Sequence, residues 1–300
     1  MTNAIAVHDL RKSYDDVDAV CGIDFAVAEG EVVALLGPNG AGKTTTIEIL
    51  EGFRQRTSGD VRVLGFDPAD GGSELRQRLG IVLQSCGIDA YLSVAEVLQM
   101  HRDYYRRQRD VDEVIELVGL TEKRDTRVRL LSGGQQRRLD VALGLVGDPD
   151  LLFLDEPTTG FDPSARRHAW EIVRNLRSLG KTVLLTTHYM DEAQYLADRV
   201  IVIAGGKIVA EGPPETIGGR ADAATVITFS VPDRLAATIP LAATRHDDSF
   251  TLESTDTTRD LHRLTTWALD AGVTLEGLTV SKPSLEDTYL RLIGEDSDQA

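Results

Sequence analysis

The sequence predicts an α/β fold with an antiparallel β subdomain at its N-terminus, a helical insertion, and a small α+β domain at its C-terminus. Three patterns predict this fold. Residues 1–30 alternate apolar and polar side chains, as half-buried antiparallel strands do. An apolar strand at 31–36 runs directly into a glycine-rich loop and a helix at 43–50. After residue 150, short apolar strands alternate with helical segments, which is typical of parallel β-α-β units.

The remaining elements of the larger domain follow from local patterns. A strand with turns is expected at 58–70 and a short strand at 81–84. Ser93 is expected to cap a helix, because Glu96 completes a capping box three residues later. The later elements are predicted, in chain order, at 111–118, 151–154, 163–179, 182–186, 190–197 and 200–204.

A cluster of glycine and proline at 211–219 predicts a domain boundary. We expect residues 1–220 to form the larger domain, with its helical subdomain at about 93–131, and residues 221–300 to form the smaller one. In the smaller domain, strands are expected at 225–231, 250–253 and 275–280, and helices at 258–271 and after Pro283-Ser284.

Composition limits the classes of function. The 300 residues carry a formal net charge of -16, which argues against nucleic acid as the main partner because phosphate backbones attract basic surfaces. Cys21 and Cys86 show no metal-binding or disulfide spacing, so we expect small core residues in a reducing compartment. We see neither a signal peptide nor an apolar run of the ~20 residues that span a membrane. We therefore expect a cytosolic chain that reaches a membrane only through a partner.

The strongest motif follows the strand at 31–36. Its glycines let backbone N–H groups converge on phosphate oxygens, and the next helix adds the positive end of its dipole. Lys43 can reach the β- and γ-phosphates, and the Thr44 hydroxyl can ligate Mg²⁺. ATP and Mg²⁺ are therefore the expected cofactors. The residues expected to bind the nucleotide here are Gly37, Pro38, Asn39, Gly40, Ala41, Gly42, Lys43, Thr44 and Thr45.

Two adjacent acids, Asp155 and Glu156, follow the apolar run at 151–154. In a parallel sheet this strand end lies beside the phosphate loop, so Asp155 can hold Mg²⁺ directly or through water. Glu156 is then the natural base or positioner for the attacking water. Without the phosphate loop, capping of the next turn would explain both acids; with it, we favour catalysis.

A second candidate phosphate site is the pentapeptide 131–135, Leu-Ser-Gly-Gly-Gln. Ser132 is expected to cap a helix whose first amides face outward and could hold a phosphate, although an ordinary helix cap gives the same pattern. The following Arg137 and Arg138 could bind anions, but we favour the interpretation that they are solvated helix charges. Two phosphate-binding loops far apart in one chain suggest a nucleotide held between two protein surfaces.

Together these motifs resemble the nucleotide-binding subunits of ATP-binding cassette (ABC) transporters, over roughly residues 4–220. The loop at 37–45 is similar to their Walker A motif, residues 151–156 to their Walker B strand, and residues 131–135 to their signature sequence. The resemblance implies an ABC-type P-loop NTPase core and an ATPase whose hydrolysis of ATP is coupled to transport.

Four further positions match motifs of the family, and their roles are implied by the resemblance alone. Tyr14 stands where these proteins stack an aromatic ring on adenine. Gln84 matches the Q-loop glutamine, a catalytic and metal-sensing residue that adjoins the membrane partner. Asp162 matches the D-loop aspartate, after Phe161 in place of the commoner leucine, and His188 matches the switch histidine that contacts the γ-phosphate. Taken singly, Tyr14 could be a turn aromatic, Gln84 a polar strand end and His188 a helix cap.

The resemblance also implies how the site is assembled. Two copies would face each other head to tail, and ATP binding would close the pair while hydrolysis opens it. The opening would pass to a separate transmembrane permease through the surface near residues 84–100, which places the chain at the cytoplasmic face of the cell membrane. The residues of one copy that would contact ATP held by the other are Ser132, Gly133, Gly134 and Gln135.

A narrower resemblance suggests the cargo. Residues 158–167 and 282–290 are similar to segments of the daunorubicin-resistance branch of ABC ATPases, which energise export of drugs or amphipathic natural products. ATPases of lipid or polysaccharide exporters, and of importers, are the alternatives. A soluble ABC protein that acts on nucleic acid is disfavoured by the single cassette and the acidic charge. The C-terminal domain could support the dimer, contact the permease or bind a regulator, and a purely stabilising role fits equally well.

Overall fold

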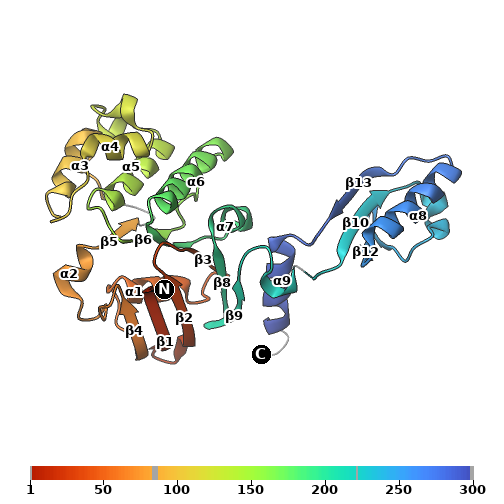
Figure 1. The fold of residues 1–300 in the computed structure, drawn as a ribbon, viewed down its shortest axis with the longest axis horizontal. Coiled ribbons are helices and arrows are strands. Elements are labelled where there is room, and N and C mark those ends of the chain that lie inside the picture. Colours follow the sequence, from red (N-terminus) through yellow and green to blue (C-terminus); the bar gives the residue numbers. More distant parts are fainter. Residues whose placement is uncertain (1, 83–86, 221, 298–300) are drawn as a thin grey trace. The chain divides into compact units, whose positions relative to one another are not determined.

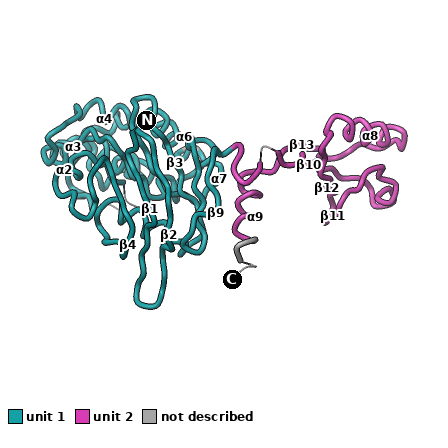
Figure 2. Tube along the Cα trace, turned by 60° about the horizontal axis from the view of Figure 1, so that its bottom comes forward, with its two compact units in different colours: residues 1–214, 295–300 teal, residues 215–294 magenta. Residues whose placement is uncertain are grey.

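The computed structural model describes residues 2–82, 87–220 and 222–297, with the backbone alone described at Ser164 and at 295–297. The chain forms two compact units, residues 1–214 with 295–300 and residues 215–294 (Figure 2). The first unit's main segment ends at Pro214, inside the glycine- and proline-rich stretch in which the sequence predicts a boundary.

The first unit contains two β-sheets and the helices that surround them (Figure 1). Its strands are β1 (Asn3–Tyr14), β2 (Val17–Ala28), β3 (Val32–Leu36), β4 (Ser58–Val63), β5 (Leu79–Val82), β6 (Leu151–Asp155), β7 (Thr182–Thr186), β8 (Arg199–Ala204) and β9 (Lys207–Gly212). Its helices are α1 (Lys43–Leu50), α2 (Gly72–Arg76), α3 (Val94–Arg102), α4 (Val111–Leu117), α5 (Gly133–Leu145), α6 (Pro163–Ser178) and α7 (Met190–Leu196).

The larger sheet has the strand order β5-β6-β7-β3-β8-β9. Its first five strands run parallel, and β9 pairs antiparallel with β8 at the edge. All five residues of β3, and likewise of β7, are buried, as expected for strands covered on both faces. The smaller sheet, β2-β1-β4, is antiparallel and forms the predicted N-terminal β subdomain.

One apolar core joins the two sheets of the first unit. Leu35 and Phe153, from the centre of the parallel sheet, belong to the same cluster of buried side chains as Ile5 and Phe25 from the antiparallel sheet. Burial of each such side chain contributes about 1.5–3 kcal/mol. This shared core fixes the phosphate loop, which leaves the end of β3, relative to both sheets.

The helical insertion is a cluster of α3, α4 and α5 that pack against one another (Figure 1). The predicted capping box of α3 is present: the Ser93 hydroxyl accepts from the Glu96 amide and the Glu96 carboxylate accepts from the Ser93 amide. Asp110 caps α4 in a similar way. Because these caps satisfy the first amides of both helices, their boundaries agree closely with the sequence prediction.

The second unit is an antiparallel sheet with the strand order β11-β12-β10-β13 and one packed helix, α8. Phe229 and Phe250 stack across β10 and β12 at a centroid distance of 6.0 Å, and Leu264 of α8 completes their core. The elements are β10 (Thr225–Ser230), β11 (Thr244–His246), β12 (Ser249–Ser254), α8 (Thr257–Asp270), β13 (Glu276–Ser281) and α9 (Leu285–Ser297).

The structure confirms the predicted fold class, with differences in its smaller elements. The sequence analysis missed α2, β9 and β11, which are short or lie beside turns where the periodic signal is weak. Cys21 is half-buried in β2 rather than in the core, with its Sγ 3.6 Å from the carbonyl oxygens of Asp18 and Gly205. Cys86 lies outside the described residues. Among the described helices, none has the length and apolar character needed to cross a membrane.

Candidate active site

The candidate site lies where three neighbouring parallel strands end. β6, β7 and β3 are adjacent in the sheet, and their carboxyl ends lead respectively to Asp155-Glu156, to Thr186–His188 and to the loop at 37–42. Ligands of open α/β sheets bind at this edge. The topology therefore brings together three segments that are far apart in the sequence.

Glycine is required at two positions of the phosphate loop because of close backbone approaches. A Cβ at Gly37 would lie 2.2 Å from the carbonyl oxygen of Ile203. Gly42, with φ near +100°, would place a Cβ 2.3 Å from the carbonyl oxygen of Ala19. Any larger residue would force the loop away from the sheet, so these glycines fix the direction in which the loop amides point.

Lys43 is buried at the first position of α1 and donates to the carbonyl oxygens of Gly37 at 2.7 Å and Pro38 at 3.0 Å. The lysine thus ties its own loop together and keeps its ammonium group at the loop centre. Burial lowers the pKa of Lys43, while the nearby Glu156 and Asp155 carboxylates act in the opposite direction. A phosphate placed in this loop would offer the ammonium group a further anionic partner.

A cavity of about 370 Å³ opens beside this loop. It is lined by residues of the phosphate loop, of the start of α1 and of the end of β6, so residues predicted from two separate motifs line the same cavity. Its lining consists of Ala19, Asn39, Gly40, Gly42, Lys43, Thr44, Thr45, Asp155 and Glu156. None of the described residues that line it belongs to the pentapeptide 131–135.

The oxygen atoms in this cavity fit a hard divalent cation. Asp155 Oδ1 accepts a hydrogen bond of 2.5 Å from the Thr186 hydroxyl, which holds the carboxylate at the strand end. Thr44 lines the same cavity from the start of α1. In the described part of the chain, no three His, Cys, Asp or Glu side chains cluster as a metal site. A carboxylate and a hydroxyl that share the ion with nucleotide phosphates suit Mg²⁺, which is usually bound in this way.

Glu156 is held in an unusual backbone conformation. Its φ is +46°, in the left-handed region, which costs a residue with a side chain about 1–2 kcal/mol. Its amide donates to the backbone oxygen of Thr186 at 3.1 Å and to the Thr186 hydroxyl at 3.0 Å. Residues in strained conformations persist only where surrounding contacts hold them in place, and such residues cluster at functional sites.

The Glu156 carboxylate contacts the predicted switch histidine. His188 Nδ1 lies 3.2 Å from Glu156 Oε1, while Oε2 accepts a 3.0 Å hydrogen bond from the Thr159 hydroxyl. The His188 side chain is about half exposed. The structure thus brings together two candidate site residues that the sequence analysis took from separate motifs.

The other predicted residues are placed less directly. The Tyr14 hydroxyl is 3.5 Å from that of Thr45, and Lys12 Nζ lies 4.8 Å from the centroid of the Tyr14 ring. Asp162 Oδ1 accepts from the Ala165 amide at 2.9 Å and so caps the start of α6. Gln84 lies outside the described residues.

The pentapeptide 131–135 opens α5, as predicted. Ser132 Oγ accepts from the Gln135 amide, and Gln135 Oε1 accepts from the Ser132 amide, so the two residues form a capping box. Ser132 and Gly133 are exposed, while Gly134 is half-buried. The capping box explains why Gln135 follows the glycines: its side chain fixes the serine at the helix start.

Arg137 corrects the sequence interpretation, which treated it as a solvated helix charge. Its side chain is only 9 % exposed, and its guanidinium donates to the carbonyl oxygens of Asp155, Glu156 and Pro157. The signal that could have located it is helical spacing: Arg137 shares the buried face of α5 with Val141 and Leu145. Arg138, by contrast, is half-buried and donates to the Gly119 carbonyl oxygen at 2.8 Å.

Comparison with known proteins shows the family to which the chain belongs. A family model described as "ABC transporter" matches residues 20–159, and one described as "ABC transporter domain-containing protein-like, C-terminal domain" matches residues 225–284. The daunorubicin resistance ATP-binding protein DrrA3 of Streptomyces coeruleorubidus is 36% identical over 98% of this chain and 96% of its own length. The chain belongs to the ABC transporter family.

Another relative and a solved structure are similar in sequence and in fold, respectively. The Nod factor export ATP-binding protein I of Rhizobium meliloti is 44% identical over 72% of this chain and 66% of its own length. Among solved structures, a dimeric ATP-binding cassette in a post-hydrolysis state, bound to ADP and phosphate, is similar with a TM-score of 0.62 and 24% identity over 70% of this chain and 98% of that one. The chain is thus an ABC ATPase, a nucleotide-binding enzyme of a family whose cassettes form dimers and work with transmembrane components.

Proposed function

We propose that this ABC ATPase drives export of a drug or amphipathic natural product through a separately encoded permease, at the cytoplasmic face of the cell membrane. The observation that carries the catalytic part is the contact of Glu156 with His188 at the edge of the cavity that holds Lys43, Thr44 and Asp155. The cargo class is supported by the names of the relatives, which include a daunorubicin resistance protein.

Within one copy, the cavity residues bind and orient ATP. The amides of the phosphate loop and Lys43 neutralise the β- and γ-phosphates, and Tyr14 contacts the adenine. Thr44 and Asp155 would hold Mg²⁺, which when bound would neutralise charge on the phosphates. Gln84 lies outside the described residues, and its proposed role in sensing Mg²⁺ or water and in adjoining the permease rests on the sequence motif alone.

Hydrolysis requires that water attack the γ-phosphorus while the bond to the β–γ bridging oxygen breaks. The Glu156 carboxylate accepts the proton of the attacking water, and ADP and phosphate are the products. His188 contacts the γ-phosphate and also keeps the Glu156 carboxylate oriented. The orientation of this carboxylate relies on the 3.2 Å contact between the two side chains.

The pentapeptide 131–135 acts on ATP held by a second copy. It lines no part of the described cavity around Lys43, yet its residues Ser132 and Gly133 are exposed at a helix start, where an anion is favoured. Two copies placed head to tail therefore complete two composite sites, in which Ser132, Gly133, Gly134 and Gln135 of one copy, with Asp162 nearby, contact the nucleotide of the other. A γ-phosphate that binds well only between two copies shifts the population toward the closed pair.

The alternative cargo is a lipid or polysaccharide rather than a drug, and the name of one relative, a Nod factor export protein, supports a cargo other than a drug. A comparison of cargo efflux from cells that contain the pair of ATPase and permease separates the two. Efflux of an anthracycline that stops in the Glu156→Gln variant supports drug export, and unchanged accumulation contradicts it.

The composite site has a direct test. In a Glu156→Gln background, ATP is expected to bind and to trap a dimer, because phosphate contacts remain while proton acceptance is lost. Adding Ser132→Arg should abolish that dimer but leave ATP affinity of the monomer within about twofold, since Ser132 serves the other copy. Size-exclusion chromatography and nucleotide titration measure the two quantities. Weaker ATP binding by the monomer would show that the pentapeptide completes its own chain's site.

A further inference from the structure

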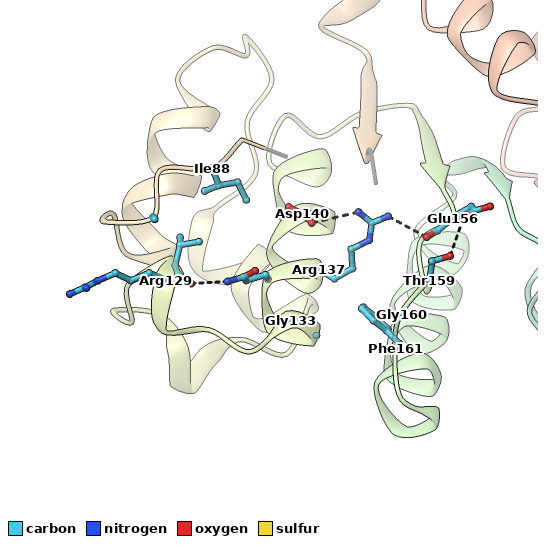
Figure 3. A pocket seen from close by; sticks show the side chains of 13 residues that line it. Ile88, Arg129, Gly133, Arg137, Asp140, Glu156, Thr159, Gly160 and Phe161 are labelled. Atoms are coloured by element: carbon cyan, nitrogen blue, oxygen red, sulfur yellow. Dashed lines mark hydrogen bonds and ion pairs between the residues drawn. The ribbon is translucent and has the colours of Figure 1, made fainter. Parts of the chain in front are cut away.

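Arg137 connects the signature helix α5 with the turn that carries Glu156 (Figure 3). Its Nη2 donates to the carbonyl oxygens of Asp155 at 3.0 Å and Glu156 at 3.3 Å, and its Nε donates to that of Pro157 at 3.2 Å. Three consecutive carbonyl groups are thus held by one planar guanidinium. A rigid fork of donors suits this task, whereas an ammonium group has no fixed geometry.

The arginine is itself held in place. Asp140, one turn later in α5, lies 3.6 Å from Arg137 Nη1, and both side chains are about nine-tenths buried. They line a cavity of about 610 Å³ between the start of α5 and the turn at 156–161 (Figure 3). The helix therefore supplies a fixed anchor, and the guanidinium extends from it to the Glu156 turn.

The residue that this contact restrains is the one in the strained conformation. The amide of Glu156 is held by Thr186 and its carbonyl oxygen by Arg137, so both sides of its left-handed Cα are fixed. The direction of the Glu156 side chain depends on this backbone. Without the Arg137 contact, the turn can relax toward a more common conformation, and the carboxylate would leave its position beside His188.

We propose that Arg137 is a positioning residue for ATP hydrolysis. It orients the Glu156 carboxylate through the backbone of the turn at 155–157. This inference rests on the proposed catalytic role of Glu156. It also means that α5, whose start serves the other copy's nucleotide, is bonded directly to the catalytic turn of its own copy. Arg137 need not touch ATP to act.

The test substitutes the guanidinium while keeping a side chain of similar length. Arg137→Lys retains a positive charge beside Asp140 but loses the planar fork, and Arg137→Met removes the charge. The matched control is Arg138→Lys, the same exchange one residue later, on a side chain that donates only to Gly119 among the contacts described. Thermal unfolding shows whether each variant folds. If Arg137→Met does not fold, the kinetics of Arg137→Lys alone decide the test.

Turnover should change while nucleotide binding does not. For Arg137→Lys we expect kcat to fall about 10- to 100-fold, as a misplaced reacting group does, with ATP affinity within about twofold of wild type. The Arg138→Lys control should keep kcat within about twofold. Wild-type turnover of Arg137→Lys, or an equal loss of ATP affinity, would overturn the inference.

A double-substitution cycle separates positioning from a general structural effect. Single-turnover hydrolysis of radiolabelled ATP measures the slow residual rates. If Arg137 acts through the Glu156 carboxylate, then adding Arg137→Lys to Glu156→Gln lowers the residual rate no further; independent effects multiply instead and contradict the proposal. Wild-type turnover of Glu156→Gln would overturn the catalytic role of Glu156 and this inference together. A slow Glu156→Gln with a fully active Arg137→Lys would overturn this inference alone.

Discussion

Glu51 illustrates how a single buried carboxyl group ties stability to pH. It ends α1, is only 5% exposed, and its Oε1 has no hydrogen-bond partner in the described part of the chain. Burial, assisted by the charges of Asp155 and Glu48, raises the pKa of Glu51 to about 8. The folded chain therefore binds a proton at Glu51 more tightly than the unfolded chain does.

The stability of the nucleotide-free protein should fall as pH rises from about 4.5 to about 8, because the folded state binds more protons than the unfolded state in this range. Glu51→Gln, which mimics the neutral carboxyl, should weaken this fall and exceed wild type in melting temperature at the upper end. Melting curves at several pH values measure the effect. Glu74→Gln, at an exposed glutamate of α2, should keep the wild-type slope; an equal change there would contradict the assignment to Glu51.

Individual residues also show what the sequence could and could not predict. The phosphate loop, Asp155 and Glu156 were predictable because each depends on a short local sequence pattern. The loop follows a strand as a run of glycines, and the two acids follow the end of an apolar strand. Arg137 and Glu51 were not, because burial of a charged side chain depends on which distant backbone or carboxylate faces it. The left-handed conformation of Glu156 has no local sequence signal either, since glycine is absent there.

At the scale of elements, the packing of α6 against α7 supports the switch region. The Trp170 indole donates to Glu192 Oε1 at 3.1 Å and its ring stacks on Tyr195 at a centroid distance of 5.0 Å. Arg166, near the start of α6, lies 4.1 Å from the centroid of the Tyr189 ring, next to His188. Glu192 is fully buried, and burial raises the pKa of its carboxyl group.

A neutral acceptor at position 192 should therefore suffice. Glu192→Gln should keep the acceptor for Trp170 and change the free energy of unfolding by less than about 1 kcal/mol. Glu192→Ala should cost about 2–4 kcal/mol, because it leaves the indole N–H of the half-buried Trp170 unpaired and opens a cavity at the fully buried position 192. Chemical denaturation measures both. Asp191→Ala, at the exposed neighbour that pairs with Arg166, should cost no more than about 1 kcal/mol; similar costs at both positions would refute a special role for Glu192.

Element prediction succeeded where periodicity and caps agreed. The helices at α3 and α5 begin at the predicted serines, because each capping box is visible in four consecutive residues. The edge strand β9 was missed because its residues continue into the turn sequence that marked the boundary. Which strands become neighbours could be inferred only in part, since the order β6-β7-β3 depends on long-range packing.

For the whole molecule, charge opposes the assembly on which the proposed function depends. Each copy carries a formal net charge of -16, and bound ATP adds further negative charge. Two such copies repel one another over distances comparable with the Debye length, about 30 Å at 0.01 M and about 8 Å at 0.15 M ionic strength. The attraction must come from short-range contacts, with the γ-phosphate bridging the phosphate loop of one copy and the signature helix of the other.

Salt should therefore strengthen the ATP-trapped dimer. For Glu156→Gln with saturating Mg²⁺ and ATP, we expect the dimer dissociation constant to decrease as ionic strength rises from about 0.01 M to about 0.15 M, because screening removes the long-range repulsion. Analytical ultracentrifugation over a concentration series measures it. ATP binding to the monomer is titrated in parallel, with the double variant Glu156→Gln/Ser132→Arg, which does not dimerise. Its ATP affinity should decrease over the same range of ionic strength, because screening weakens the attraction of the anionic ligand to Lys43. Opposite salt dependences of the two steps would separate assembly from nucleotide binding, whereas a dimer that weakens with salt would show that ion pairs between the copies outweigh their net repulsion.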